Sequence, residues 1–326
     1  FNGGAVYIEK AFKHNKFNNI TFKNNKALRN GGAIYTVPSS LVNTFENSTF
    51  ENNNASEFDG GAINLYTDLL ETVFNNVKFI NNTAGFNGGA INIDHGSKDN
   101  LFNNTSFISN AATRNGGAIY TRYNSIRNTY KNTLFKNNTA INVDGGAINS
   151  LEDSNLRIEN VDFTANRSKY GGAISNDGQI EIEDVRFKDN HAISGGAIVN
   201  ASELTIKNAD FENNHADNAG AIDNWRFLKI TDSLFSKNSA KDGGSIVNDG
   251  KMNLDGVTFE RNSAESCGAI NNQRDGHITL TNSKFRLNES KEYGIMSNSG
   301  YLNIKGAQFI DNYPGVDFGS LYNSDY

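Results

Sequence analysis

Apolar and polar residues alternate in short bursts along this chain, and the bursts predict β-strands. Residues 195–218 contain three apolar segments. The first ends at Ile198. In the second, Leu204 and Ile206 alternate with polar neighbours, and the third ends at Phe211. Alternation with a period of two is typical of strands with one buried face, whereas no segment shows the 3.6-residue spacing of an amphipathic helix. The pattern predicts three short strands per repeat, separated by turns at asparagine.

The same pattern returns at a nearly fixed interval through the whole chain. A Gly-Gly-Ala-Ile sequence motif (here called a word), intact or altered, starts at thirteen positions from Gly3 to Phe318. The steps between them are 28, 29, 28, 28, 29, 26, 24, 24, 24, 24, 26 and 25 residues. A Phe-x-x-Asn word alternates with it. A period in this range is typical of stacked repeats, each of which forms one turn, or rung, of a solenoid.

We therefore predict an all-β fold, a right-handed single-stranded parallel β-helix (three-sheet β-solenoid) of about 12 rungs. Equivalent residues of successive rungs then lie about 4.8 Å apart. Asn, Asp or Gly stands three residues before each Phe, as expected for a turn with positive φ. The predicted core contains a column of stacked rings: Phe22, Phe50, Phe79, Phe107, Phe135, Phe163, Phe187, Phe211, Phe235, Phe259, Phe285 and Phe309.

Rung length changes near residue 150. Residues 1–150 have rungs of 28–29 residues, for which we predict longer strands and protruding loops. Residues 151–326 have short rungs of 24–26 residues, and an internal ladder of asparagines is predicted from Asn176 onward. Because no linker separates the two parts, residues 1–326 are predicted to form a single continuous β-helix. We also expect the chain to be a fragment of a longer protein.

Composition narrows the classes of function. A net charge of −6 argues against a nucleic-acid partner, and no apolar run is long enough for direct membrane insertion. The single cysteine, Cys267, replaces the first glycine of its repeat, which favours a small buried residue over a catalytic thiol. No cofactor is predicted. Aspartates at turns offer some oxygen ligands for calcium, but the Gly-Gly-x-Gly-x-Asp calcium repeat is absent.

The alternation of Gly-Gly-Ala-Ile at Gly195 with Phe-x-x-Asn at Phe211, repeated through the chain, resembles the polymorphic outer membrane protein (Pmp) repeat. This repeat occurs in passenger regions of chlamydial polymorphic membrane proteins and in adhesin-like surface proteins of methanogenic archaea. The Asn-rich, Pro-poor composition is more similar to the archaeal group. The resemblance implies a right-handed parallel β-helix that is displayed outside the cell and used for attachment.

Three sets of residues are candidates for a site. His191 and His215 occupy the same slot in adjacent rungs and are candidate transition-metal ligands, provided that a nearby carboxylate such as Asp217 joins them. Asp162 and Asp210 are candidates for acid–base catalysis on a polysaccharide, although a charge-balanced sheet would show the same pattern. Aromatic and basic residues favour interfaces, which makes the following residues candidates for a binding surface: Tyr35, Tyr66, Tyr120, Arg122, Tyr123, Arg127, Trp225 and Arg226.

Three hypotheses about function follow. The first is a non-enzymatic adhesin, or the stalk of one, on the cell surface, with a protein or glycan of a host or neighbouring cell as its partner. The second is a subunit of an extracellular filament or sheath that associates end to end, since open strand edges invite such addition. The third is a secreted β-helix polysaccharide lyase or hydrolase.

Overall fold

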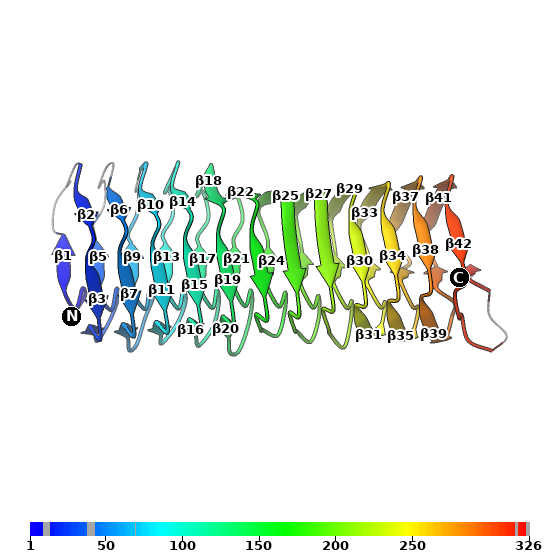
Figure 1. Cartoon of the computed structure of the whole chain (residues 1–326), viewed down its shortest axis with the longest axis horizontal. Coiled ribbons are helices and arrows are strands. Elements are labelled where there is room, and N and C mark those ends of the chain that lie inside the picture. The colour runs from blue at the N-terminus through cyan, green and yellow to red at the C-terminus, as the bar shows by residue number, and fades with distance from the viewer. Residues whose placement is uncertain (9–13, 38–42, 69, 317–318, 324–326) are drawn as a thin grey trace.

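The computed structural model describes residues 1–8, 14–37, 43–68, 70–316 and 319–323. Every regular element in these ranges is a β-strand, and each strand pairs in parallel with the equivalent strand of the next rung. Figure 1 shows the rungs stacked along one axis into a rod, with the two chain ends at its opposite ends. These ranges contain no helix long and apolar enough to cross a membrane. The predicted all-β parallel β-helix is confirmed.

The Gly-Gly-Ala-Ile words supply the first sheet, in which rung follows rung in chain order. The described part of the chain contributes thirteen strands to it. They are β1 (Val6–Ile8), β5 (Ile34–Thr36), β9 (Ile63–Leu65), β13 (Ile91–Ile93), β17 (Ile119–Thr121), β21 (Ile148–Ser150), β24 (Ile174–Asn176), β26 (Ile198–Asn200), β28 (Ile222–Asn224), β32 (Ile246–Asn248), β36 (Ile270–Asn272), β40 (Met296–Asn298) and β43 (Leu321–Asn323).

Each rung contributes two consecutive strands to the second sheet, with a bend between them. Equivalent strands of successive rungs form two columns within this sheet. Its first column contains β2 (Lys16–Asn18), β6 (Thr44–Glu46), β10 (Val73–Asn75), β14 (Leu101–Asn103), β18 (Asn128–Lys131), β22 (Asn155–Glu159), β29 (Phe227–Thr231), β33 (Lys251–Asp255), β37 (His277–Thr281) and β41 (Tyr301–Lys305). Its second column, which carries the Phe residues, contains β3 (Thr21–Lys23), β7 (Thr49–Glu51), β11 (Lys78–Ile80), β15 (Ser106–Ile108), β19 (Leu134–Lys136), β23 (Asp162–Thr164), β30 (Leu234–Ser236), β34 (Thr258–Glu260), β38 (Lys284–Arg286) and β42 (Gln308–Ile310). The strands β25 (Gln179–Lys188) and β27 (Glu203–Glu212) pass through the bend and belong to both columns.

Two small sheets follow the Phe-x-x-Asn word. In the early rungs of the described chain the strands are β4 (Lys26–Ala27), β8 (Asn54–Ala55), β12 (Thr83–Ala84), β16 (Ala111–Ala112) and β20 (Thr139–Ala140). In the later rungs they are β31 (Ser239–Asp242), β35 (Ser263–Ser266) and β39 (Glu289–Glu292). Two of the three predicted strand columns therefore share one bent sheet, and these short strands close the rung.

The predicted turn column lies at the bend of the second sheet. This column consists of the Asn, Asp or Gly that stands three residues before each Phe. All of its residues have positive φ, from 48° at Asn282 to 71° at Gly306. Asn, Asp and Gly tolerate this left-handed conformation better than other residues, which explains why only these three types occupy the column.

The prediction of longer strands in residues 1–150 is wrong. In this part of the described chain the strands of the two large sheets have three or four residues, whereas β25 and β27 have ten. The extra residues of each early rung lie in the connectors between the first and second sheets, such as 94–100 and 122–127. Residues 38–42 and 69, which belong to two of the predicted loops, lie outside the described residues, as does Phe318.

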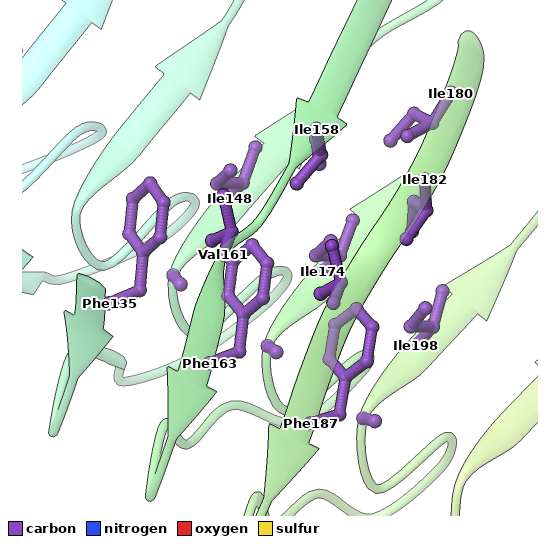
Figure 2. Close-up of a cluster of buried hydrophobic side chains, with 14 of the residues drawn as sticks. Phe135, Ile148, Ile158, Val161, Phe163, Ile174, Ile180, Ile182, Phe187 and Ile198 are labelled. Atoms are coloured by element: carbon purple, nitrogen blue, oxygen red, sulfur yellow. The ribbon is translucent and has the colours of Figure 1, made fainter. Parts of the chain in front are cut away.

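The phenylalanine column forms the centre of the core. Successive rings from Phe22 to Phe309 lie face to face, with centroids 4.4–5.0 Å apart. Figure 2 shows Phe135, Phe163 and Phe187 stacked beside columns of isoleucine. Burying one such ring contributes about 1.5–3 kcal/mol, so the column supplies a large share of the stability of every rung.

Two internal ladders of asparagine amides run beside this core. The later one, predicted from Asn176 onward, is present: Asn200 Nδ2 donates to Asn224 Oδ1 at 2.7 Å, and equivalent bonds follow in the next rungs. The other is formed by the Phe-x-x-Asn word. Asn214 Nδ2 donates both to the carbonyl oxygen of Phe187 and to Oδ1 of Asn238, each at 3.0 Å. Each amide of this second ladder therefore ties its rung to both neighbours.

The two glycines of the Gly-Gly word meet different backbone requirements. The first glycine needs positive φ, 62° at Gly195. The second lies against the next rung, where a Cβ on Gly196 would be 2.1 Å from the carbonyl oxygen of Gly220.

Cys267, in a first-glycine slot, is 1% exposed, and burial raises the pKa of its thiol to about 12. This thiol is therefore protonated near neutral pH.

Candidate functional site

The connectors between the first and second sheets change in length along the rod. Residues 122–127 and 151–154 form connectors of six and four residues, and residues 273–276 form another of four. The four rungs between them have connectors of two residues: 177–178, 201–202, 225–226 and 249–250. Longer connectors project further from the strands that they join. Figure 1 shows the upper edge of the rod lower over β25 and β27 than over β18.

The four short connectors form the floor of a groove of about 950 Å³. The longer connectors on either side contribute its two ends. The lining consists of residues 152–155, 177–179, 201–203, 225–227 and 249–251, together with Ile126, Asp275 and His277. We name this set the short-rung groove.

The internal asparagine ladder fixes the floor of the groove. Asn224 Nδ2 donates to the carbonyl oxygen of Arg226 at 3.2 Å, and Asn200 Nδ2 donates to that of Phe227 at 3.0 Å. The backbone N–H of Trp225 donates to Asn200 O at 2.8 Å. The indole of Trp225 is nevertheless 48% exposed. A rigid backbone thus presents a large aromatic side chain to solvent.

Carboxylates outnumber cations in the short-rung groove. Its permanent cations are Arg226 and Lys251. Burial raises the pKa of Asp177, with a further contribution from Glu152, and burial also raises the pKa of Asp249, with a further contribution from Asp275. The groove carboxylates are Glu152, Asp153, Asp177, Glu203, Asp249 and Asp275.

The predicted surface residues divide between this groove and the earlier rungs. Trp225 and Arg226 lie in the groove. Tyr35 and Tyr120 are buried in the middle of β5 and β17, with 8% and 6% exposure, and offer little contact area.

The other four predicted surface residues lie outside the groove. The ring of Tyr66 is 5.8 Å from that of Tyr35, and Tyr123 stacks on His95 at 5.7 Å. Arg122 pairs with Asp94 at 3.2 Å. Arg127 makes a two-point contact with Asp99, at 2.6 and 2.7 Å. Both guanidinium groups are thus already paired with carboxylates of the same chain.

His191 and His215 stack as expected, with ring centroids 5.2 Å apart, but they lack a third metal ligand. Asp217 pairs with Lys241 at 2.9 Å, and Asp189 accepts a hydrogen bond from Asn213 at 2.6 Å. Within the described ranges, no group of three or more His, Cys, Asp or Glu side chains could hold a metal ion. The predicted carboxylate ligand is therefore missing from this pair.

The candidate catalytic carboxylates lie in a charge ladder. Asp162, Arg186 and Asp210 are directly opposite one another in adjacent rungs, on the exposed face of the second sheet. Arg186 also pairs with Glu212 at 2.6 Å. Each acid thus lies beside a cation, the arrangement expected of a sheet that balances its surface charge.

The groove carboxylates were not predicted from the sequence, although the spacing of the repeats contains the signal. The steps between Gly-Gly-Ala-Ile words read 26, 24, 24, 24, 24, 26 from Gly145 to Tyr293. The two steps of 26 are the rungs with four-residue connectors, and the four steps of 24 are the floor. Comparing each rung with its neighbours would have located the groove.

Comparisons with known proteins agree with this geometry. The family model described as "Right handed beta helix region" matches residues 69–235 and 117–285, and the Chlamydia polymorphic membrane protein repeat matches residues 19–37. No curated protein sequence matches the chain.

Solved structures with a similar chain path include two of the surface adhesin PfbA of Streptococcus pneumoniae. One is 15% identical over 99% of this chain and 92% of its own, with a TM-score of 0.46. The other is 13% identical over 90% and 84%, with a TM-score of 0.39. The catalytic domain of a GH87 α-1,3-glucanase in complex with nigerose is 12% identical over 98% and 63%, with a TM-score of 0.45. At these values the similarity carries no information about function.

Proposed function

Because this chain belongs to the right-handed β-helix family, we propose that it serves attachment at a cell surface, as an adhesin or the stalk of one, and binds its partner in the short-rung groove without catalysis. The observation that carries the proposal is the exposed indole of Trp225 on a floor held by the asparagine ladder. Fixed aromatic side chains in concave sites are typical anchors of protein interfaces.

The repeat supports an extracellular location. Residues 19–37 match the repeat of chlamydial polymorphic membrane proteins, and the same Gly-Gly-Ala-Ile and Phe-x-x-Asn words continue through the chain. The proposed partner is a protein or glycan on a host or neighbouring cell. The similarity to archaeal adhesin-like proteins remains a prediction from composition.

The shape of the molecule suits this role. From Phe22 to Phe309 the core makes eleven steps of about 4.8 Å, so the Phe column alone is about 53 Å long. Every step repeats the same hydrogen bonds and ring stacking, which makes the rod stiff and allows it to hold a groove away from a surface.

The groove also favours a second function, polysaccharide hydrolysis or lysis. Asp177 and Asp249 combine a raised pKa with a position in the same groove as an exposed tryptophan, and a general acid in a glycosidase needs a raised pKa. A turnover assay of the full chain on acidic and neutral polysaccharides separates this function from attachment. Reducing-end or unsaturated-sugar products that disappear in Asp249→Asn would establish the enzyme and contradict the attachment proposal.

The attachment proposal is tested with the full chain coupled to fluorescent beads and applied to a panel of bacterial and animal cells. We expect Trp225→Ala to lower the number of bound beads at least about tenfold, because loss of an aromatic anchor that the partner buries costs about 1.4 kcal/mol or more. The matched control is Tyr123→Ala, since Tyr123 has similar exposure, 46%, but lies outside the groove. Equal attachment by the two variants would contradict a role of the groove.

Sedimentation of the free chain, which reveals end-to-end polymers, tests the filament hypothesis.

A further inference from the structure

The carboxylates of the short-rung groove lack the cationic partners that carboxylates elsewhere on this molecule have. On the second sheet, Glu183 pairs with Lys207 at 2.8 Å and Glu260 with Arg286 at 2.6 Å. In the described chain no ion pair includes any of the six groove carboxylates. Two of them have neutral amide partners: Glu203 accepts a hydrogen bond from Gln179 at 3.0 Å, and the side-chain amide of Gln273 lies 2.7 Å from Asp249 Oδ1. The groove therefore holds an excess of negative charge that no cation of the chain neutralises at close range.

The carboxylates are spread along the groove. Asp177, Ala201, Trp225 and Asp249 follow equivalent residues of four adjacent paired strands. Asp177 and Asp249 are thus three rungs, or about 14 Å, apart, and Trp225 belongs to one of the two rungs between them. A single metal ion needs converging ligands, and no suitable group of three or more exists among the residues that the structure describes. This spacing fits several positive charges on an extended ligand.

An extended polypeptide has matching dimensions. It rises about 3.3 Å per residue, so the side chains of residues i and i+4 lie on the same face about 13 Å apart. Lysine or arginine at these two positions would reach Asp177 and Asp249. A cation over the face of Trp225 gains a further attraction to the ring.

We propose that the short-rung groove binds an extended cationic segment of a partner protein, with lysine or arginine side chains four residues apart. The inference rests on the proposed attachment function, for which it names the chemistry of the partner. Charge complementarity between this segment and the groove carboxylates, which form no ion pair within the described chain, provides the affinity, and the groove ends limit the segment to about five residues.

The chain itself contains the reporter for the test. Trp225 is its single tryptophan, so intrinsic tryptophan fluorescence reports on the groove alone. The full chain is titrated with pentalysine, pentaglutamate, a glucosamine pentamer and calcium chloride. We expect a saturable change in emission with pentalysine that weakens at least tenfold between 0.05 and 0.5 M salt (about the range over which screening becomes severe). Pentaglutamate and calcium are expected to cause no saturable change.

Two double variants of equal charge complete the design. Asp177→Asn with Asp249→Asn is expected to weaken pentalysine binding at least tenfold. Asp162→Asn with Asp210→Asn, on the exposed face of the second sheet, removes the same charge outside the groove and is expected to change binding less than twofold. Thermal unfolding of both variants checks that they are folded.

The inference is overturned if pentalysine causes no saturable change, or if both double variants weaken its binding equally. Tighter binding of the glucosamine pentamer than of pentalysine overturns the assignment to a polypeptide. The two proposals fail separately. If cells bind the Asp177→Asn, Asp249→Asn variant normally but not Trp225→Ala, the cationic ligand is wrong and attachment through the groove stands. If pentalysine binds but Trp225→Ala attaches normally to cells, the attachment proposal is wrong.

Discussion

At the scale of single residues, the two glycines of the Gly-Gly word differ in how well a side chain is tolerated. A Cβ on Gly196 would lie 2.1 Å from the Gly220 carbonyl oxygen and 2.9 Å from the backbone of His215. A Cβ on Gly195 would also lie close to backbone, 2.2 Å from the Ile198 carbonyl oxygen, but the first slot is more tolerant because Ala219 and Cys267 occupy it with φ of 56° and 59°. We predict that Gly196→Ala lowers the free energy of unfolding by about 3 kcal/mol, through overpacking, and that Gly195→Ala lowers it by about 1 kcal/mol, through left-handed strain. Urea unfolding measures both, and equal losses would contradict this account.

At the scale of the rung, the buried asparagine of Phe-x-x-Asn holds three turns of the chain together. Asn214 donates to Phe187 O and Asn238 Oδ1, and its own Oδ1 accepts from the backbone N–H and Nδ2 of Asn190. Asn214→Leu keeps the volume but leaves these buried groups without partners, each at a cost of about 1–3 kcal/mol. We predict a loss of at least about 3 kcal/mol in urea unfolding. The neighbouring Asn213→Gly is the control, because Asn213 is exposed with φ of 55°, which glycine adopts freely. A similar loss in both variants would show that the ladder is not the cause.

The same rung shows which parts of the structure were predictable. The Phe column and the turn column follow from the sequence because each requires a particular residue type at a fixed interval, as Phe211 and Asn208 illustrate. The role of Asn214 did not follow, since its hydrogen bonds connect neighbouring rungs and a rung considered alone shows only a turn residue.

The site was less predictable than the fold for a related reason. Trp225 and Arg226 stood out as aromatic and basic breaks in the repeat, and both lie in the groove. Asp177 and Asp249 did not, because aspartate is common in turns. Their importance depends on the heights of the connectors around them, which is a relation between six rungs. Tyr35 and Tyr120 were expected on the surface but are buried in three-residue strands.

At the scale of the whole molecule, the carboxylates form two classes. One class is exposed and paired, and its pKa values are lowered by contacts such as Arg127 with Asp99 and Arg186 with Glu212. The other class has pKa values raised above 3.8 by burial: Asp59, Asp144, Asp177, Asp223, Asp242 and Asp249. Solvent screening reduces the effect of the exposed class on stability, so the buried class dominates.

The buried class sets the sign of the pH dependence. For Asp144, burial raises the pKa to about 6, so between pH 3.8 and about 6 the folded chain retains a proton that the unfolded chain releases. Stability therefore rises as pH falls through this window, and it is lost as pH rises through the folded pKa. His191, whose pKa is lowered by burial, acts in the opposite direction, whereas the other five aspartates of the buried class act in the same direction as Asp144. We predict a higher melting temperature at pH 5 than at pH 7. Asp144→Asn should raise the melting temperature at pH 7 by about 2 °C and have little effect at pH 4.5. The reason is that the half-buried carboxylate of Asp144 is ionised at pH 7 and neutral at pH 4.5, so that only at pH 7 does the substitution remove an unfavourable charge. A melting temperature that falls steadily from pH 7 to pH 5 would mean that the paired surface carboxylates, and not the buried ones, control the stability of the rod.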